Sequence, residues 1–197
     1  MMWGLELGAS VKPYLIDYKN KWVCYDKKLE RKFSNQAFRE EEIFLKIPKI
    51  LVRQVMGKEQ VFATIDRKAF YADQSVYIPL PKNESTNLYF ILGLLNSKLM
   101  YYFFSKTFSD RKETLPKIKG IQLAEFPIKQ TTKTQQNEII KLVDQLLQLN
   151  KDKQNTTLPN QFEMKENRIA YAENKINQIV YELYDLTEDE IKIIEAN

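Results

Sequence analysis

The sequence predicts an α+β fold in which a mixed, strand-rich region with a buried core helix is followed by an antiparallel pair of helices. Three observations predict it. Short β-branched and aromatic segments separated by turn residues fill residues 1–130. Within them, the stretch 88–104 is apolar on nearly every side, and residues 131–197 carry long runs with helical periodicity. We therefore expect two domains, 1–130 and 131–197.

The strongest strand signal lies at residues 49–65. The segments KILVRQV and QVFATI flank a turn that contains Gly57, and β-branched residues on both sides of such a turn are typical of a hairpin. Further strands are expected at KWVCY and SVYIPL. The segment NQAFREEEIFLKIP predicts a short helix that ends before Pro48, because the residue before a proline disfavours helical backbone.

The stretch 88–104, LYFILGLLNSKLMYYFF, is the most apolar of the chain. A membrane-spanning helix needs roughly 20 apolar residues, and this stretch is shorter and interrupted by Asn96, Ser97 and Lys98. Its apolar side chains point to both faces of a helix, which is typical of a buried helix. We expect a core helix that begins after Asn87.

Residues 131–197 predict two packed helices and a terminal turn. The first is expected after Thr134 as its N-cap, and the polar segment NKDKQNTTLPNQ links it to the second. The second carries apolar residues at alternating steps of three and four, which is the spacing of a helical seam: Ile169, Ala172, Ile176, Ile179 and Leu183. Thr187 and Glu190 form the pattern of a capping box at the start of a last short helix.

Several chemistries are disfavoured by composition. The chain contains no histidine and one cysteine, Cys24, so a histidine-based triad, a multi-cysteine zinc site and an internal disulfide are excluded. Its five glycines form neither of the common phosphate-binding loop motifs. The start of the sequence lacks the features of a secretory signal, and we expect a reducing, cytoplasmic setting.

Charge is distributed unevenly along the chain. Residues 1–130 carry 22 Lys and Arg against 14 Asp and Glu, a net charge of 22 − 14 = +8, whereas residues 131–197 carry 8 against 12, or −4. An excess of positive charge among aromatic and polar residues is typical of a nucleic-acid-binding surface. The two regions are therefore expected to have different roles.

The candidate DNA contacts are basic residues and one glutamine of the first region. Arg53 and Gln54 draw most attention, because Arg can pair with guanine and Gln with adenine in the major groove, while Lys usually contacts phosphate. As neighbours on a strand they could equally point to opposite faces, one of them partly covered. The whole candidate set is Lys32, Arg53, Gln54, Arg67, Lys68, Arg111, Lys112, Lys117 and Lys119.

A succession of motifs resembles a known family over nearly the whole chain. The motifs are GASVKPY, KWVCYD, PKILVRQV, ATID, LYFILGLLNSKLMYYFF, LPKIKGIQLAEFPI, IIKLVDQLL and INQIVYELYDLTEDEIKIIE. In this order they resemble the TaqI-like C-terminal specificity domain. That family supplies DNA target recognition to restriction-modification enzymes, and its plan is similar to that of the specificity subunits of type I systems.

The resemblance implies a function and partners. The domain would bind a short sequence in double-stranded DNA and place an adenine methyltransferase, and in some enzymes a nuclease, on its target. Base contacts would lie before residue 88, and the helices of 131–197 would face the parent enzyme. The chain lacks an N-P-P-Y-like tetrapeptide and a methyl-donor loop, so S-adenosylmethionine and Mg²⁺ are implied for the parent enzyme and no cofactor for this chain.

The sequence is also compatible with two other functions. The paired helices could form a protein assembly module, with the basic region as ordinary surface. Asp26, Glu30 and Lys32 could instead form the metal site of a small magnesium-dependent nuclease, although the same spacing of Glu and Lys recurs elsewhere in this Lys- and Glu-rich chain.

Overall fold

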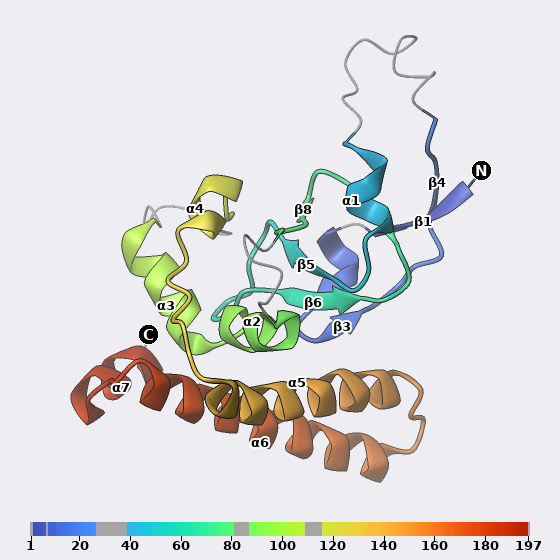
Figure 1. Cartoon of the computed structure of the whole chain (residues 1–197). Coiled ribbons are helices and arrows are strands. Elements are labelled where there is room, and N and C mark those ends of the chain that lie inside the picture. The colour runs from blue at the N-terminus through green and yellow to red at the C-terminus, as the bar shows by residue number, and fades with distance from the viewer. Residues whose placement is uncertain (1, 7, 27–38, 81–86, 109–115, 197) are drawn as a thin grey trace.

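The computed structural model describes residues 2–6, 8–26, 39–80, 87–108 and 116–196. They form the α+β fold that the sequence predicts. Figure 1 shows the strands in one half of the molecule and two long helices running side by side below them, with a short helix between the two layers. The long helices are α5 (Lys133–Gln154) and α6 (Pro159–Leu183), and the short one is α2 (Leu88–Leu95).

A three-stranded antiparallel sheet lies at the centre of the strand region. Its order is β6-β5-β8, and its strands are β5 (Lys49–Arg53), β6 (Ala63–Asp66) and β8 (Val76–Tyr77). The pairing of β5 with β6 confirms the predicted hairpin. In the segment that connects β5 to β6, the Gly57 N–H donates to the Gln60 carbonyl across 2.9 Å, and a Cβ on Gly57 would lie 2.4 Å from the Phe62 ring. Only glycine fits this turn without a shift of that ring.

Two smaller sheets complete the strand region. In one, β1 pairs with β4 in antiparallel and with β7 in parallel orientation, and in the other β2 pairs with β3. The predicted strands at KWVCY and SVYIPL are confirmed as β4 and β8, and the predicted short helix ends before Pro48 as α1. Cys24, on β4, is an exposed free thiol. The bounds are β1 Met2–Glu6, β2 Val11–Lys12, β3 Leu15–Ile16, β4 Trp22–Cys24, α1 Glu41–Leu45 and β7 Tyr71–Ala72, with a 3-10 turn at Gly8–Ser10.

The apolar stretch 88–104 is buried as expected but forms two helices where one was predicted. Asn87 caps α2, and a new helix, α3 (Lys98–Thr107), begins after Ser97, whose hydroxyl accepts from the Met100 N–H. The break also has a tertiary cause: the Asn96 side chain accepts from the N–H of Ala63 and donates to its carbonyl, each at 3.0 Å. Asn96 thus joins the end of α2 to strand β6.

Helices α5 and α6 pack antiparallel, as predicted (Figure 1). The predicted seam of α6 is buried at Ile169, Ala172, Ile176 and Leu183. The predicted cap of α5 was wrong, since Thr132, not Thr134, accepts from the Gln135 N–H and Gln135 completes the capping box. The predicted capping box of Thr187 and Glu190 starts α7 (Glu188–Glu195).

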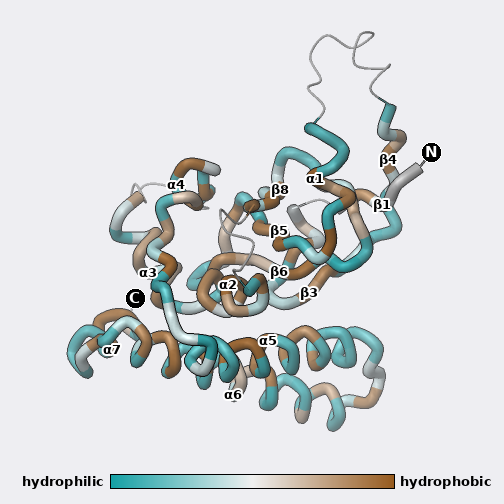
Figure 2. The backbone as a smooth tube through the Cα atoms, viewed as in Figure 1, coloured by the Kyte–Doolittle hydropathy of each residue, from teal (hydrophilic) through white to brown (hydrophobic). Residues whose placement is uncertain are grey.

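One hydrophobic core joins the strands to the long helices. It includes Ile50 and Ile65 of the central sheet, Leu92 of α2, Val143 of α5 and Ile176 of α6. In Figure 2 the two long helices alternate between hydrophobic and hydrophilic residues, as expected of helices that bury one face. Among the described residues, no helix combines the length and the apolar character needed to cross a membrane.

Candidate nucleic-acid interface

The predicted DNA-contact residues fall into two groups at opposite ends of the β5–β6 hairpin. Lys49 is opposite Asp66 at one end of the pairing, and Val52 is opposite Ala63 at the other. Arg53 and Gln54 follow Val52, whereas Arg67 and Lys68 follow Asp66. Lys117 and Lys119 join the first group, because the N–H of Ile118 between them donates to the Gln54 carbonyl. The predicted residues Lys32, Arg111 and Lys112 lie outside the described residues.

Arg53 ends β5 and lies over an aromatic ring. Its N–H donates to the Phe62 carbonyl across 2.8 Å, and its guanidinium carbon lies 5.3 Å from the centre of the Phe62 ring. This cation–π contact holds the guanidinium in place without using its N–H donors. Within the described part of the chain, the guanidinium makes no hydrogen bond or ion pair, so its five donors remain available.

Three hydrogen bonds hold Gln54 in place. Its backbone N–H donates to the Ser75 carbonyl at 2.8 Å, and its carbonyl accepts from the Ile118 N–H at 2.9 Å. Its side-chain amide donates to the Tyr77 hydroxyl at 3.2 Å. That bond uses one of the two N–H donors of the amide. The second N–H and the amide oxygen remain, and these can donate to N7 and accept from the N6 amino group of adenine in the major groove.

The segment Pro116–Lys119 adds two lysines beside this glutamine. Besides the bond from Ile118 to Gln54, the Met56 N–H donates to the Pro116 carbonyl, and Val55 pairs with Lys117 in an isolated antiparallel bridge. Ile118 is fully buried, while Lys117 and Lys119 on either side of it are exposed. Because side chains alternate between faces along an extended segment, the two lysines lie on the same, exposed face.

A short helix, α4 (Gly120–Ala124), continues from these lysines and begins close to Tyr77. The Lys119 N–H donates to the Gln122 side-chain oxygen at 2.8 Å, which closes the first turn. A Cβ built on Gly120 would lie 3.5 Å from the Tyr77 ring. We call the end of the hairpin that carries Arg53, Gln54, Tyr77, Lys117, Lys119 and α4 the β5-end surface.

Arg67 at the other end of the hairpin makes contacts within the chain. Its guanidinium lies 5.3 Å from the centre of the Tyr89 ring and pairs with Asp144 of α5 at 3.3 Å. Both charges are more than half exposed, and exposed ion pairs stabilise a fold by at most about 1 kcal/mol. Arg67 thus connects the hairpin to α2 and α5, while Lys68 beside it is exposed.

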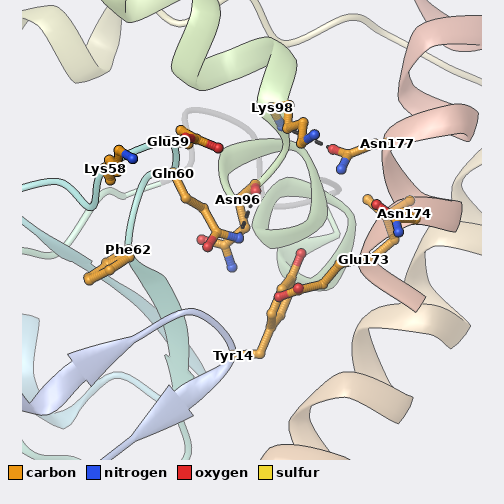
Figure 3. A pocket seen from close by; sticks show the side chains of 11 residues that line it. Tyr14, Lys58, Glu59, Gln60, Phe62, Asn96, Lys98, Glu173, Asn174 and Asn177 are labelled. Atoms are coloured by element: carbon orange, nitrogen blue, oxygen red, sulfur yellow. Dashed lines mark hydrogen bonds between the residues drawn. The ribbon is translucent and has the colours of Figure 1, made fainter. Parts of the chain in front are cut away.

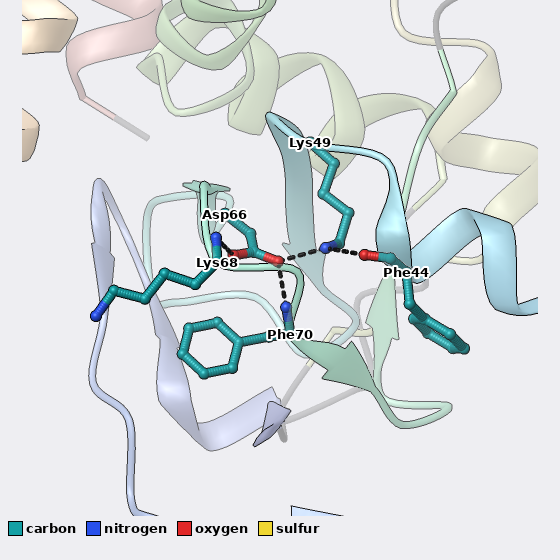
Figure 4. A network of polar contacts seen from close by, with 5 residues as sticks. All are labelled: Phe44, Lys49, Asp66, Lys68 and Phe70. Atoms are coloured by element: carbon teal, nitrogen blue, oxygen red, sulfur yellow. Dashed lines mark hydrogen bonds and ion pairs between the residues drawn. The ribbon is translucent and has the colours of Figure 1, made fainter. Parts of the chain in front are cut away.

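A buried ion pair supports this end of the hairpin (Figure 4). The Lys49 ammonium pairs with Asp66 and donates to the Phe44 carbonyl at 2.7 Å, and Asp66 also accepts from the backbone N–H groups of Lys68 and Phe70. Burial lowers the pKa of Lys49, and its contact with Asp66 opposes that shift. With all of these bonds made, the pair fixes the turn that carries Arg67 and Lys68.

A polar cavity of about 330 Å³ lies between the strand region and α6 (Figure 3). Burial raises the pKa of Glu173, which faces it from α6, and contacts with Gln60 and Lys153 oppose the shift. Burial, and then the negative charge of Glu173, raises the pKa of the Tyr14 hydroxyl. Tyr14 is held with a positive φ of 56° by a bond from its N–H to the Ala63 carbonyl. The cavity is therefore a polar junction between the two halves of the molecule.

The nuclease hypothesis stays a prediction. Of its three residues Asp26 is described, whereas Glu30 and Lys32 lie outside the described residues. In the part of the chain that the structure describes, no three acidic, cysteine or histidine side chains lie close enough to hold a metal ion.

Sequence reasoning missed Tyr77, Phe62 and the short helix α4. Tyr77 was placed in a predicted strand, but its bond to Gln54 depends on the pairing of β5 with β8. Phe62 follows the predicted hairpin turn, and a strand pattern gives no sign that its ring lies under Arg53. No sequence signal brings α4 to this place, because the contact is set by the distant pairing of Ile118 with Gln54.

A family model decides what kind of domain this is. The model of the TaqI-like C-terminal specificity domain matches residues 6–128, which is more than half of the chain. The chain belongs to this family. It is therefore a TaqI-like C-terminal specificity domain, and the match contains all the described residues of the β5-end surface.

The fold of this specificity domain is similar to part of a solved enzyme. The type IIL restriction-modification enzyme MmeI, whose structure was determined in complex with DNA, matches with a TM-score of 0.64 at 13% sequence identity. The match covers 94% of this chain and 28% of MmeI, so the chain spans less than a third of that protein. A search of curated proteins found no match.

Proposed function

We propose that this specificity domain recognises a short sequence in double-stranded DNA through its β5-end surface. The observation that carries the proposal is the set of free hydrogen-bonding groups at one end of the hairpin: the guanidinium of Arg53 and the amide of Gln54, each held in place by an aromatic residue. Their geometry suits guanine and adenine respectively, and the exposed Lys117 and Lys119 suit the flanking phosphates. The DNA in the MmeI complex supports the same partner for this chain.

The role of the domain would be to place other parts of its parent enzyme on the target. We propose an adenine methyltransferase as the part that acts, with the target base flipped out of the duplex, as enzymes that modify bases require. The domain itself carries out no chemical step in this proposal. S-adenosylmethionine, and Mg²⁺ if a nuclease is present, would be held outside this chain.

The helical pair would contact the parent enzyme. On α6, Met164 and Tyr171 are 64% and 70% exposed and lie seven residues apart, so they share one face of the helix. Exposed apolar side chains in such a row favour contact with another protein. This observation also keeps the assembly-module alternative open, in which the domain binds a protein and DNA plays no part.

Selection from a randomised duplex library tests the proposal. The full chain would be incubated with the library at low and at moderate salt, and the bound DNA sequenced. Enrichment of one short motif, with affinity that falls as salt rises, is the expected result. Binding to an isolated methyltransferase region that is independent of salt, together with equal retention of all DNA sequences, would favour the assembly module and contradict target recognition.

A further inference from the structure

Ile121 is the most exposed of the large hydrophobic side chains in the described residues, at 71%. It lies in the first turn of α4, two residues after Lys119 and next to Gly120, which lies close to the Tyr77 ring. Single exposed hydrophobic residues are common on protein surfaces, so exposure alone shows little. What matters is the fixed position of this one on the β5-end surface.

Helix α4 is held from both ends although none of its own residues is buried. Ile118, before it, is fully buried and bonded to Gln54, and Phe126, after it, is 6% exposed. Between these anchors, the Leu123 N–H donates to the Lys119 carbonyl at 3.0 Å. The chain therefore holds Ile121 in a defined place without covering it.

That place is near the proposed adenine-reading amide. A Cβ built on Gly120 would lie 3.5 Å from the Tyr77 ring, and the Tyr77 hydroxyl accepts from the Gln54 side chain. Ile121 thus follows directly after a residue that lies close to the partner of Gln54. Lys117 and Lys119, in the segment that leads into α4, provide positive charge for a DNA backbone next to the same turn.

We propose that Ile121 contacts the C5-methyl group of a thymine in the target sequence. In the major groove the thymine methyl is the one apolar feature among hydrogen-bond donors and acceptors, so an aliphatic side chain on a reading surface suits it. This inference rests on the proposed function and adds a specificity residue to it. Arg53, Gln54 and Ile121 would then match the distinctive groups of guanine, adenine and thymine.

The test replaces each thymine of the selected target, one at a time, by deoxyuridine, which lacks only the methyl group. Loss of one buried methyl contact, worth about 0.8 kcal/mol, corresponds to roughly fourfold weaker binding. The full wild-type chain should show this loss at one position. Ile121→Ala should bind the thymine and uracil duplexes equally at that position and keep its response to guanine substitutions elsewhere.

A matched control is Ile193→Ala, which removes another exposed isoleucine side chain, 55% exposed, from α7. It should keep the wild-type difference between thymine and uracil. An enriched motif whose thymines can all be replaced without loss would overturn the role of Ile121 and leave the proposed function standing, as would a difference that persists in Ile121→Ala. If no motif is enriched, the proposed function and this inference fail together.

Discussion

The side-chain amide of Gln54 donates a hydrogen bond to the hydroxyl of Tyr77 across 3.2 Å, although the two residues are 23 positions apart. The bond fixes the plane of an amide that a strand would otherwise leave free to rotate. It also leaves the donor and acceptor that pair with adenine. Tyr77 therefore acts in this account as a positioning residue for Gln54.

Tyr77→Phe removes this hydroxyl and keeps the ring that packs against the core. We expect adenine preference at one position of the target to fall several-fold, since a bidentate pair contributes about 1–3 kcal/mol and only its orientation is lost. Competition between duplexes that differ at that base pair measures the change. A variant that keeps full adenine preference, at unchanged thermal stability, would remove Tyr77 from recognition.

Lys117→Ala and Lys119→Ala should weaken binding to all DNA sequences about equally, because the lysines are expected to contact phosphates. Each phosphate contact contributes about 0.9 to the slope of log affinity against log salt. The slope of each variant should therefore decrease by about that amount. Lys141→Ala, at an exposed position of α5, is the control that removes the same charge elsewhere and should leave the slope nearly unchanged.

Alanine substitutions at Gly93 and Gly120 form a matched pair that tests the packing of the domain. A Cβ on Gly93 would lie 2.4 Å from Ile139 of α5, whereas one on Gly120 would lie 3.5 Å from Tyr77, an ordinary contact. Gly93→Ala should lower the free energy of unfolding by about 1–3 kcal/mol through overpacking. Gly120→Ala should be tolerated, and equal effects in urea unfolding would contradict close contact between α2 and α5.

Glu173 should make stability depend on pH. Its pKa is raised in the folded protein by burial, so the folded state holds its proton more tightly than the unfolded state. The stabilisation by Glu173 is therefore fully present below the pKa that it has in the unfolded state. It is lost as pH rises through the pKa that it has in the folded state. Glu173→Gln, which cannot ionise, should lack this decline.

The difference in unfolding free energy between wild type and Glu173→Gln, followed as a function of pH, isolates the contribution of this residue. The pKa of Glu190 is shifted in the opposite direction, since hydrogen bonds from Thr187 lower it. The free energy of unfolding of both proteins would be measured by urea from pH 4 to pH 8. A gap between them that stays constant with pH would contradict the raised pKa.

Local sequence patterns predicted the elements whose cause is local. The hairpin of β5 and β6, the antiparallel helices and the cap at Thr187 follow from alternation, periodicity and capping residues close together in the chain. The cap of α5 could also have been found, because Thr132 is followed by Gln135 at the capping-box spacing, which Thr134 lacks.

The features that were missed have distant causes. The apolar run 88–104 contains no proline, and its break combines the local cap at Ser97 with bonds from Asn96 to Ala63, 33 positions away. The candidate residues were chosen by charge and side-chain type. Their division into two groups, with Arg67 joined to Asp144 and Arg53 placed on Phe62, depends on pairing between segments that a linear pattern does not reveal.

The most direct test of the central claim is a comparison of binding-site selection by wild type, Arg53→Ala and Arg67→Ala. Arg53→Ala should lose preference at one G·C pair, at a cost of about 1–3 kcal/mol, and keep it at the other positions, while Arg67→Ala should keep the whole motif. A motif unchanged by Arg53→Ala but relaxed by Arg67→Ala would place base recognition at the opposite end of the hairpin and contradict the account.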